Sequence, residues 1–464
     1  MTPSSSRGSR RVLATRLTAL VIAGTLVAAG CGREEDDAAE DKPSTATETS
    51  GADGATDEGD APAAFINPDD DCTNYEGTKG ITGDTIKIGT VRPATGPYSI
   101  FDKVTSGLQG WVDSTNSKGG VKAGDGKTYK LELVKEDDAY DPAKTPGLVK
   151  KLVEQDGVFA IVGQIGTSNN LAVRDYMNEN CIPSIALATG STEWGKANEY
   201  PWFIGGLPSY ATEAHAFAEY LKETKPTATV ALLYQDDDFG QAYQKTLKKE
   251  IEGTEITIVA EQPFNPLTET STESKVAQLA SSKADVFFVG IGGTPCPRTL
   301  TFMPADWTPM TYVSLTCASK TAMSLAGGKD EGVFSTQATL DPSGATDQAN
   351  PRVQAFLTDG AAAGISADDL QGGIAVIGWN FGAMFGELLA QSPEVSRAGV
   401  MNTAYSLDGV NFGLLRDEVS ATTNGDEDPW ALEDLRIVKR TAGEWVEVTP
   451  MTSYAGKSNS FEGK

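Results

Sequence analysis

The sequence has a single histidine among its 464 residues. His215 lies in the segment Ala211–Glu219, whose pattern is helical, so we expect it at a surface or partly buried position of a helix. One such histidine provides no Ser-His-Asp or Cys-His arrangement for nucleophilic catalysis. The chain also has no C-x-x-C spacing, which removes a usual basis for a zinc site. We therefore expect no catalytic residue, no metal and no cofactor.

Basic residues are scarce as well. The chain has 38 Lys and Arg against 64 Asp and Glu, which gives a formal net charge of −26. Nucleic-acid-binding proteins cluster Lys and Arg against phosphates, so this balance argues against a nucleic-acid partner. It suits a protein that works in solution outside the cytoplasm.

The sequence also lacks an apolar run long enough to be read as a membrane span. Leu17–Ala29 is mostly apolar but shorter than the roughly 20 residues that a span needs. It follows a basic start and leads into small residues, which is the order of a secretory signal. The basic residues are Arg7, Arg10 and Arg11. Ala28-Ala29-Gly30-Cys31 looks like a bacterial lipobox, in which Cys31 is lipidated; the alternative is an ordinary signal peptide with a chance cysteine.

Two further features of the N-terminal region bear on export. Ser9–Leu13 resembles a twin-arginine signal, although Ala14 stands where such signals often carry Lys, so the export route stays open. Gly32–Asp71 is polar and acidic and has only Phe65 and Ile66 as large apolar residues, which predicts a flexible tether. We expect a signal peptide over residues 1–30, and the lipidated cysteine with its linker over 31–75.

Four cysteines remain once Cys31 is assigned to the lipid. They are Cys72, Cys181, Cys296 and Cys317. An even number in an oxidising compartment permits two disulfides, with three possible connectivities. We favour the pairs Cys72–Cys181 and Cys296–Cys317.

Strand and helix patterns alternate along the mature chain, which predicts an α/β fold with parallel sheets. The expected strands are 85–91, 129–134, 158–163, 183–188, 229–234, 256–261 and 285–290. The expected helices are 107–116, 142–155, 167–180, 210–223, 239–251, 271–282, 350–359 and 369–390. About 390 folded residues are too many for one such sheet, so we expect two lobes.

Ligands of open parallel sheets bind at the carboxyl ends of the strands. Gln164–Ser168 follows one predicted strand and opens a helix, where free N–H groups and hydroxyls favour an anionic group; the alternative is a plain N-cap. Thr189-Gly190-Ser191 follows the next strand. Tyr98 follows the first strand and is either an aromatic wall of the site or a turn residue.

A dinucleotide site is not supported by the glycines. Gly163-x-x-Gly166 and Gly290-Ile-Gly292-Gly293 each follow a strand, but neither completes G-x-G-x-x-G with a well-placed ribose-binding acid.

Several segments together resemble a known family across nearly the whole mature chain. They are Ile81–Gly89, Thr95–Tyr98, Glu136–Pro142, Lys151–Val158, Ala160–Gly163, Tyr234–Gln241 and Glu331–Phe334. The sequence is similar to the branched-chain-amino-acid (Leu/Ile/Val-binding) type of substrate-binding protein of ABC importers, the type I periplasmic-binding fold. The resemblance implies two Rossmann-like lobes joined by a three-strand hinge, with a cleft that closes on the ligand. It places lobe I at 76–207 and 330–425, and lobe II at 208–329 and 426–464.

The resemblance also implies where a ligand is held. The first lobe would use Gly166, Thr167 and Ser168 together with Ala188, Thr189 and Gly190, and Tyr98 would add an aromatic wall. The second lobe would add Phe239 and the loop at Thr294. Amino-acid binders of this type carry an acid in that loop, whereas Gly293–Cys296 has none. A buried ammonium without a counter-charge is costly, so a carboxylate, an amide or a neutral polar ligand becomes a serious alternative to an amino acid.

The implied partners are a small-molecule ligand and the permease subunits of an ABC importer. The protein would be a monomer outside the cytoplasm, held to the bacterial membrane by the lipid on Cys31. A ligand-sensing receptor that signals through a membrane partner is the alternative function; the sequence shows no transmembrane or signalling segment that would favour it.

Overall fold

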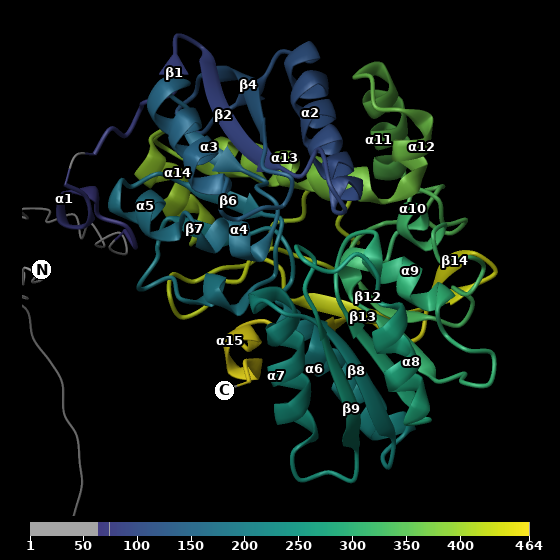
Figure 1. Cartoon of the computed structure of the whole chain (residues 1–464). Helices are drawn as coiled ribbons and strands as arrows, with labels where there is room; N and C mark the ends of the chain where they lie inside the picture. Colours follow the sequence, from purple (N-terminus) through teal and green to yellow (C-terminus); the bar gives the residue numbers. More distant parts are fainter. Residues whose placement is uncertain (1–63, 74, 464) are drawn as a thin grey trace, which may run out of the picture. The chain divides into compact units, whose positions relative to one another are not determined.

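The computed structural model describes residues 64–73 and 75–463, which form two β-sheets covered by helices (Figure 1). The predicted signal peptide, Cys31 and most of the linker lie outside the described residues. Among the described helices, none combines the length and the apolar character that a bilayer crossing requires.

Strands between residues 81 and 205 form the first sheet, in the order β3-β4-β2-β5-β6-β7 with β1 beside β2. β4, β2, β5, β6 and β7 run parallel, whereas β1 and β3 pair with their neighbours antiparallel. The bounds are β1 Ile81–Thr82, β2 Thr85–Arg92, β3 Val121–Lys122, β4 Thr128–Asp137, β5 Ala160–Val162, β6 Ser184–Leu187 and β7 Phe203–Gly205.

The second sheet has the order β14-β13-β12-β11-β10-β8-β9, with β15 beside β13. β9, β8, β10, β11 and β12 run parallel, and β13 pairs antiparallel with β12, β14 and β15. The bounds are β8 Thr229–Gln235, β9 Thr257–Phe264, β10 Val286–Gly290, β11 Met310–Val313, β12 Phe334–Gln337, β13 Asp434–Thr441, β14 Glu444–Glu447 and β15 Thr452–Ser453.

The central strands of the second sheet are apolar on both faces. Along β8, Val230 and Leu232 belong to one buried cluster, whereas Ala231 and Leu233 belong to another. Successive side chains of a strand point to opposite faces, so both faces are covered. This explains why the parallel strands appear in the sequence as continuous apolar runs.

Helices cover both sheets. Nine helices lie before β7 or between β12 and β13 in the described sequence, and with the first sheet they make up what we call the first half. They are α1 Pro68–Asp71, α2 Asp102–Ser117, α3 Thr145–Lys150, α4 Thr167–Leu171, α5 Arg174–Glu179, α11 Pro351–Ala362, α12 Ala367–Gly372, α13 Ile374–Gln391 and α14 Arg397–Ala404. The others are α6 Tyr210–Thr224, α7 Asp238–Ile251, α8 Glu273–Ser281, α9 Pro295–Thr301, α10 Lys320–Met323 and α15 Ser458–Phe461. Short helical turns are η1 Ser99–Phe101, η2 Lys151–Gln155, η3 Thr192–Gly195 and η4 Leu315–Cys317.

Helices α2 and α13 pack very closely against each other (Figure 1). A Cβ added at Gly107 would lie 1.9 Å from the carbonyl oxygen of Ala375, and one added at Gly378 would lie 1.6 Å from that of Val104. Only glycine permits this approach of the two backbones. The close contact fixes the position of α13, whose first turns lie beside a segment where the chain crosses between the sheets.

The chain passes three times between the two sheets: after β7, after β12, and before β13. Strand β12 belongs to the second sheet, although it falls inside the stretch 330–425 that we assigned to lobe I. The lobe boundaries as a whole stay a prediction.

Most predicted elements are present, with three corrections. The predicted helix 142–155 begins only at Thr145 and continues as a π-helical turn from Lys151. The predicted helix 167–180 is interrupted between α4 and α5, and the predicted helix 369–390 is interrupted at Gly373, whose φ is +87°.

Candidate ligand-binding site

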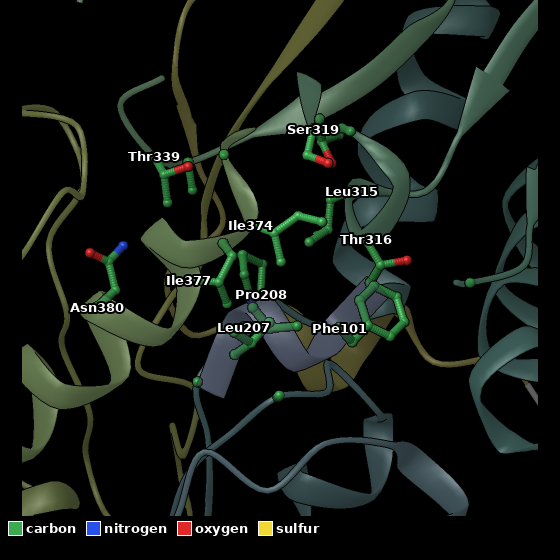
Figure 2. A pocket seen from close by; sticks show the side chains of 18 of the residues that line it. Phe101, Leu207, Pro208, Leu315, Thr316, Ser319, Thr339, Ile374, Ile377 and Asn380 are labelled. Carbon is green, nitrogen blue, oxygen red and sulfur yellow. The ribbon is translucent and has the colours of Figure 1, made fainter. Parts of the chain in front are cut away.

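A cavity of about 140 Å³ lies where strands of both sheets end (Figure 2). From the first sheet its wall includes Ile165–Thr167 after β5 and Ala188 after β6. From the second it includes Phe239 after β8, Gly292 after β10 and Leu315 after β11. This is the edge at which open α/β sheets bind their ligands.

Four of the predicted ligand-binding residues line this cavity: Gly166, Thr167, Ala188 and Phe239. Gly166 has a φ of +102°, and an added Cβ would lie 2.4 Å from Oδ1 of Asn169. The turn from β5 into α4 therefore requires glycine. It brings the backbone of the loop to the cavity without a side chain in between.

Thr189 and Gly190 lie just behind the wall. The hydroxyl oxygens of Thr167 and Thr189 are 2.7 Å apart, and both residues are buried. The carbonyl oxygen of Gly190 accepts a hydrogen bond of 2.7 Å from the backbone N–H of Tyr210, which itself lines the cavity. These contacts hold the two loops of the first sheet beside the start of α6.

Tyr98 connects the two sheets instead of lining the cavity. Its ring is fully buried and stacks on the ring of Tyr140, with centroids 4.0 Å apart. Its hydroxyl donates to Oε1 of Gln235 at 2.5 Å, and Gln235 is the last residue of β8. The turn after β2 is thereby tied to the second sheet.

Ser168 and Thr294 also contact the opposite half of the molecule. The hydroxyl of Thr294 donates to the carbonyl oxygen of Pro97 at 2.8 Å, and that of Ser168 lies 3.4 Å from Oδ2 of Asp237. Contact of these residues with a ligand stays a prediction.

Asp237 caps helix α7. Its Oδ1 accepts from the backbone N–H groups of Phe239 and Gly240, and its Oδ2 accepts from Nε2 of Gln235 at 2.7 Å. Burial raises the pKa of this carboxyl above its usual value. Asp237 therefore orders the loop that carries Phe239, with its own oxygens occupied by donors of the chain.

Glu213 lies behind the second-sheet side of the wall. It accepts hydrogen bonds from the hydroxyls of Tyr243 at 2.8 Å and Tyr312 at 2.6 Å, and from the backbone N–H of Leu315 at 2.8 Å. Burial raises the pKa of Glu213 to about 7. No sequence motif singled out this residue; its place on the buried face of a helix is a signal shared by many core positions.

Much of the wall comes from segments that the sequence did not indicate. Gln337–Thr339 and Leu432 come from chain crossings, and Ile374, Ile377 and Asn380 come from the first turns of α13. Figure 2 shows Ile374 and Ile377 facing the same space as other wall residues, with Asn380 at its edge. The apolar residues resemble ordinary core, and only the tertiary fold brings them to the cavity.

Two disulfides confirm the predicted pairs, Cys72–Cys181 and Cys296–Cys317. The second joins α9 to η4. The first residue of η4, Leu315, belongs to the wall, so this disulfide braces one side of the cavity.

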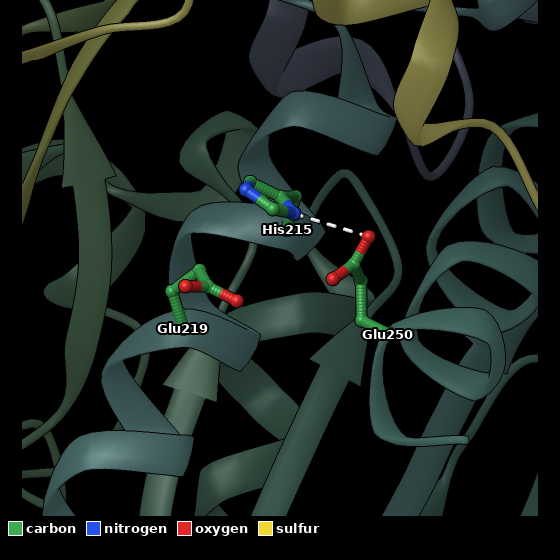
Figure 3. Close-up of side chains that lie close together, drawn as sticks. All are labelled: His215, Glu219 and Glu250. Atoms are coloured by element: carbon green, nitrogen blue, oxygen red, sulfur yellow. Dashed lines mark ion pairs between the residues drawn. The ribbon is translucent and has the colours of Figure 1, made fainter. Parts of the chain in front are cut away.

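His215 lies half-buried on α6, which confirms its predicted helical position (Figure 3). Its Nδ1 is 3.0 Å from Oε1 of Glu250, and Glu219 is close enough for the three to hold a metal ion. Lys222 already pairs with Glu219 at 2.7 Å and with Glu250 at 3.1 Å, and the imidazole stacks on Phe461 at 3.8 Å. The cluster is therefore accounted for by ion pairs between α6 and α7 and by the stacking of His215 on Phe461 of α15.

The chain belongs to the periplasmic binding protein family, whose sequence profile matches residues 85–436. Leu/Ile/Val-binding protein BraC3 of Rhizobium johnstonii is 27% identical over 209 residues, which are 44% of this chain and 54% of that protein. The leucine-, isoleucine-, valine-, threonine- and alanine-binding protein of Pseudomonas aeruginosa is 26% identical over 215 residues, 46% of this chain and 55% of that protein. The chain thus spans about half the length of the curated relatives it matches.

Solved structures extend the likeness to most of the chain. A branched-chain amino acid ABC transporter protein from Thermus thermophilus with bound valine matches with a TM-score of 0.70 and 17% identity, covering 81% of this chain and 98% of that one. A solute-binding protein from R. palustris in complex with benzoate matches with a TM-score of 0.65 and 18% identity, covering 80% and 98%. These likenesses confirm the predicted α/β fold of the type I periplasmic-binding class.

Proposed function

We propose that this chain is an extracytoplasmic solute-binding lipoprotein that captures a small molecule in the cavity and delivers it to the permease subunits of an ABC importer. It acts as a monomer, without catalysis of its own, and is held to the bacterial membrane by a lipid on Cys31. The proposed ligand-binding residues are Tyr98, Gly166, Thr167, Ser168, Ala188, Thr189, Gly190, Phe239 and Thr294.

The observation that carries the proposal is the construction of the cavity. Its wall combines strand ends of both sheets with the crossing segments at Gly206–Pro208 and Gln337–Thr339. A ligand there would contact both halves of the molecule at once. Binding would therefore favour the arrangement in which the halves are together, which gives a membrane partner a shape to recognise.

Filling the cavity tests the proposal. Thr316 lies half-buried in the wall, so Thr316→Trp should occupy the space that a ligand needs. We expect the purified full-length chain to gain thermal stability with at least one compound in a screen of amino acids, amides and small organic acids. That gain should be about 2.7 kcal/mol at a hundredfold excess over the dissociation constant, and Thr316→Trp should abolish it.

The control is Thr268→Trp, which places the same side chain on an exposed loop of the second half. This variant should keep the ligand-induced shift. A screen without any hit, or turnover of a hit into product, contradicts the proposed function. Mass spectrometry of the N-terminal peptide of the same preparation tests the anchor, because an unmodified Cys31 contradicts it.

A further inference from the structure

We infer that the cavity takes an uncharged, compact and largely apolar molecule with a neutral hydrogen-bonding group, in place of an amino-acid zwitterion. This inference rests on the proposed function and names its ligand class. Among the residues that the structure describes, those that line the cavity include no charged side chain. The polar members are hydroxyls and amides, such as Thr167, Ser319, Thr339 and Asn380.

Two carboxylates that order parts of the wall, those of Glu213 and Asp237, are occupied by donors of the chain itself. Glu213 accepts from two tyrosine hydroxyls and one backbone N–H, as described above. Asp237 accepts from two backbone N–H groups and from Gln235. Neither residue belongs to the wall, so neither is placed to receive a ligand ammonium. An ammonium in the cavity would lose its water without gaining a counter-charge.

A third carboxylate, behind the first-sheet loops, is satisfied in the same way. Asp138 accepts from the hydroxyl of Thr145 at 2.7 Å, from Nδ2 of Asn169 at 2.8 Å and from the backbone N–H of Tyr140 at 2.9 Å. It orders the turn that brings Tyr140 to the wall and is itself outside the wall. The carboxylate of Asp138 thus stabilises the local fold and does not face the cavity.

Apolar side chains dominate the wall on the side of the crossings. Ile374, Ile377 and Phe381 of α13 face this space together with Leu435 and Val438 of β13. A dry cavity of about 150 Å³ lined by such side chains holds a molecule of the size of benzene, and this cavity has about 140 Å³. The size therefore suits a ligand with a short branched or aromatic body.

The wall contains a buried hydrogen-bond donor that has no partner within the described chain. The indole N–H of Trp445 is buried and makes no hydrogen bond within the described chain. An unsatisfied buried donor is unfavourable. A carbonyl or hydroxyl oxygen of a neutral ligand would satisfy it.

Four compounds with the same isobutyl body test the charge preference: isocaproamide is neutral, isocaproate is an anion, leucinamide is a cation and leucine is a zwitterion. Dissociation constants for the full-length chain are measured by isothermal titration calorimetry. We expect isocaproamide to bind at least tenfold more tightly than each of the other three. Equal or tighter binding of a charged compound overturns the inference and leaves the proposed function standing. Binding of none of the four also overturns it, whereas the proposed function fails if the wider screen finds no ligand or if a hit is turned over into product.

A pair of variants at Ile377 separates charge from shape. Ile377→Asp places a carboxylate in the wall, and Ile377→Asn places a neutral group of the same size there. We expect the aspartate variant to reverse the preference, so that leucinamide binds more tightly than isocaproamide, while the asparagine variant keeps the preference for the amide. The same preference in both variants overturns the inference. Gln391→Glu, at the exposed end of the same helix, is the control for a charge added outside the cavity.

Discussion

Glu213 is fully buried in α6, and its carboxylate holds Tyr243, Tyr312 and the backbone of Leu315 in place. Burial raises its pKa to about 7, from an ordinary value of 4.5. The unfolded chain therefore loses this proton near pH 4.5, whereas the folded chain keeps it until about pH 7. The stability that the group contributes is present at low pH and is lost as the pH rises through this window.

We predict that Glu213→Gln weakens the pH dependence of stability. In the unchanged chain, this group should lower the free energy of unfolding by roughly 3 kcal/mol between pH 4.5 and pH 8. In the variant, the free energy of unfolding should fall less as the pH rises. Some of the fall should remain, because burial also raises the pKa of Glu433 to about 7. Urea unfolding at several pH values measures the effect. The control is Glu223→Gln, at an exposed position of the same helix. If the free energy of unfolding of Glu213→Gln falls with pH as much as that of the unchanged chain, the prediction is contradicted.

Single residues also show where sequence reasoning stops. The sequence placed Gly166 and Thr167 in the site because the carboxyl ends of parallel strands gather at one edge, and the family resemblance added Ala188. It could not place Ile377 there, because an isoleucine on an apolar helix face looks the same whether a core or a cavity lies next to it. Tyr98 lies outside the lining of the cavity and hydrogen-bonds Gln235 of the other sheet, which depends on where Gln235 arrives; its contact with a ligand stays a prediction.

Among the secondary-structure elements, η4 depends on a covalent brace. Leu315 begins this turn and belongs to the cavity wall, and the disulfide from Cys317 to Cys296 holds the turn against α9. None of the four bridged cysteines lines the cavity, but only Cys317 shares a turn with a wall residue, whereas Cys72–Cys181 lies in other elements. The two bridges therefore offer a matched comparison.

We predict that the double substitution Cys296→Ala with Cys317→Ala lowers both stability and ligand affinity. Loss of the disulfide that closes the loop between Cys296 and Cys317 costs about 3 kcal/mol of stability in the chain-entropy account. The freed turn also no longer holds Leu315 in the wall. Cys72→Ala with Cys181→Ala should lower stability without changing affinity. Denaturant unfolding and calorimetric titration with a screened ligand measure the two effects. Equal affinity losses in both double variants would contradict the local role of the second bridge.

Element boundaries were less predictable than element types. Asp141 and Pro142 look like a helix start, yet Asp141 accepts a hydrogen bond from Ala143 in a preceding turn and α3 begins at Thr145. Strands β11, β12 and β13 were not predicted at all. β11 and β12 are four residues long, and they gain their hydrogen bonds from strands distant in sequence, so short-range patterns carry little signal for them.

The whole molecule follows the architecture that alternating strand and helix patterns predict. Two parallel-rich sheets arise because apolar strands must be covered on both faces, and one sheet could not bury a chain of this length. The cavity depends on the whole molecule, because its wall is built from both sheets and from the crossings between them. The halves are also joined by polar contacts, among which the bond from Tyr98 to Gln235 is buried.

Removing that bond should weaken ligand binding without removing any contact in the cavity wall. The hydroxyl of Tyr98 and Oε1 of Gln235 meet only when the two halves are together, and under the proposed function a ligand favours that same arrangement. A buried hydrogen bond contributes about 1 kcal/mol, so Tyr98→Phe should raise the dissociation constant about fivefold. Calorimetric titration with a screened ligand measures this change, and small-angle scattering of the free protein should show a larger radius of gyration.

The matched control for this substitution is Tyr129→Phe. The hydroxyl of Tyr129 donates to Asp125 at 2.8 Å, and both residues belong to the first half, so this bond is made whether or not the halves meet. Its loss should reduce stability slightly and leave the affinity unchanged. If both variants bound equally well, the contact at Tyr98 would not be coupled to the ligand. If both lost affinity alike, the effect would reflect general destabilisation. Only a loss confined to Tyr98→Phe connects ligand binding to the meeting of the two halves.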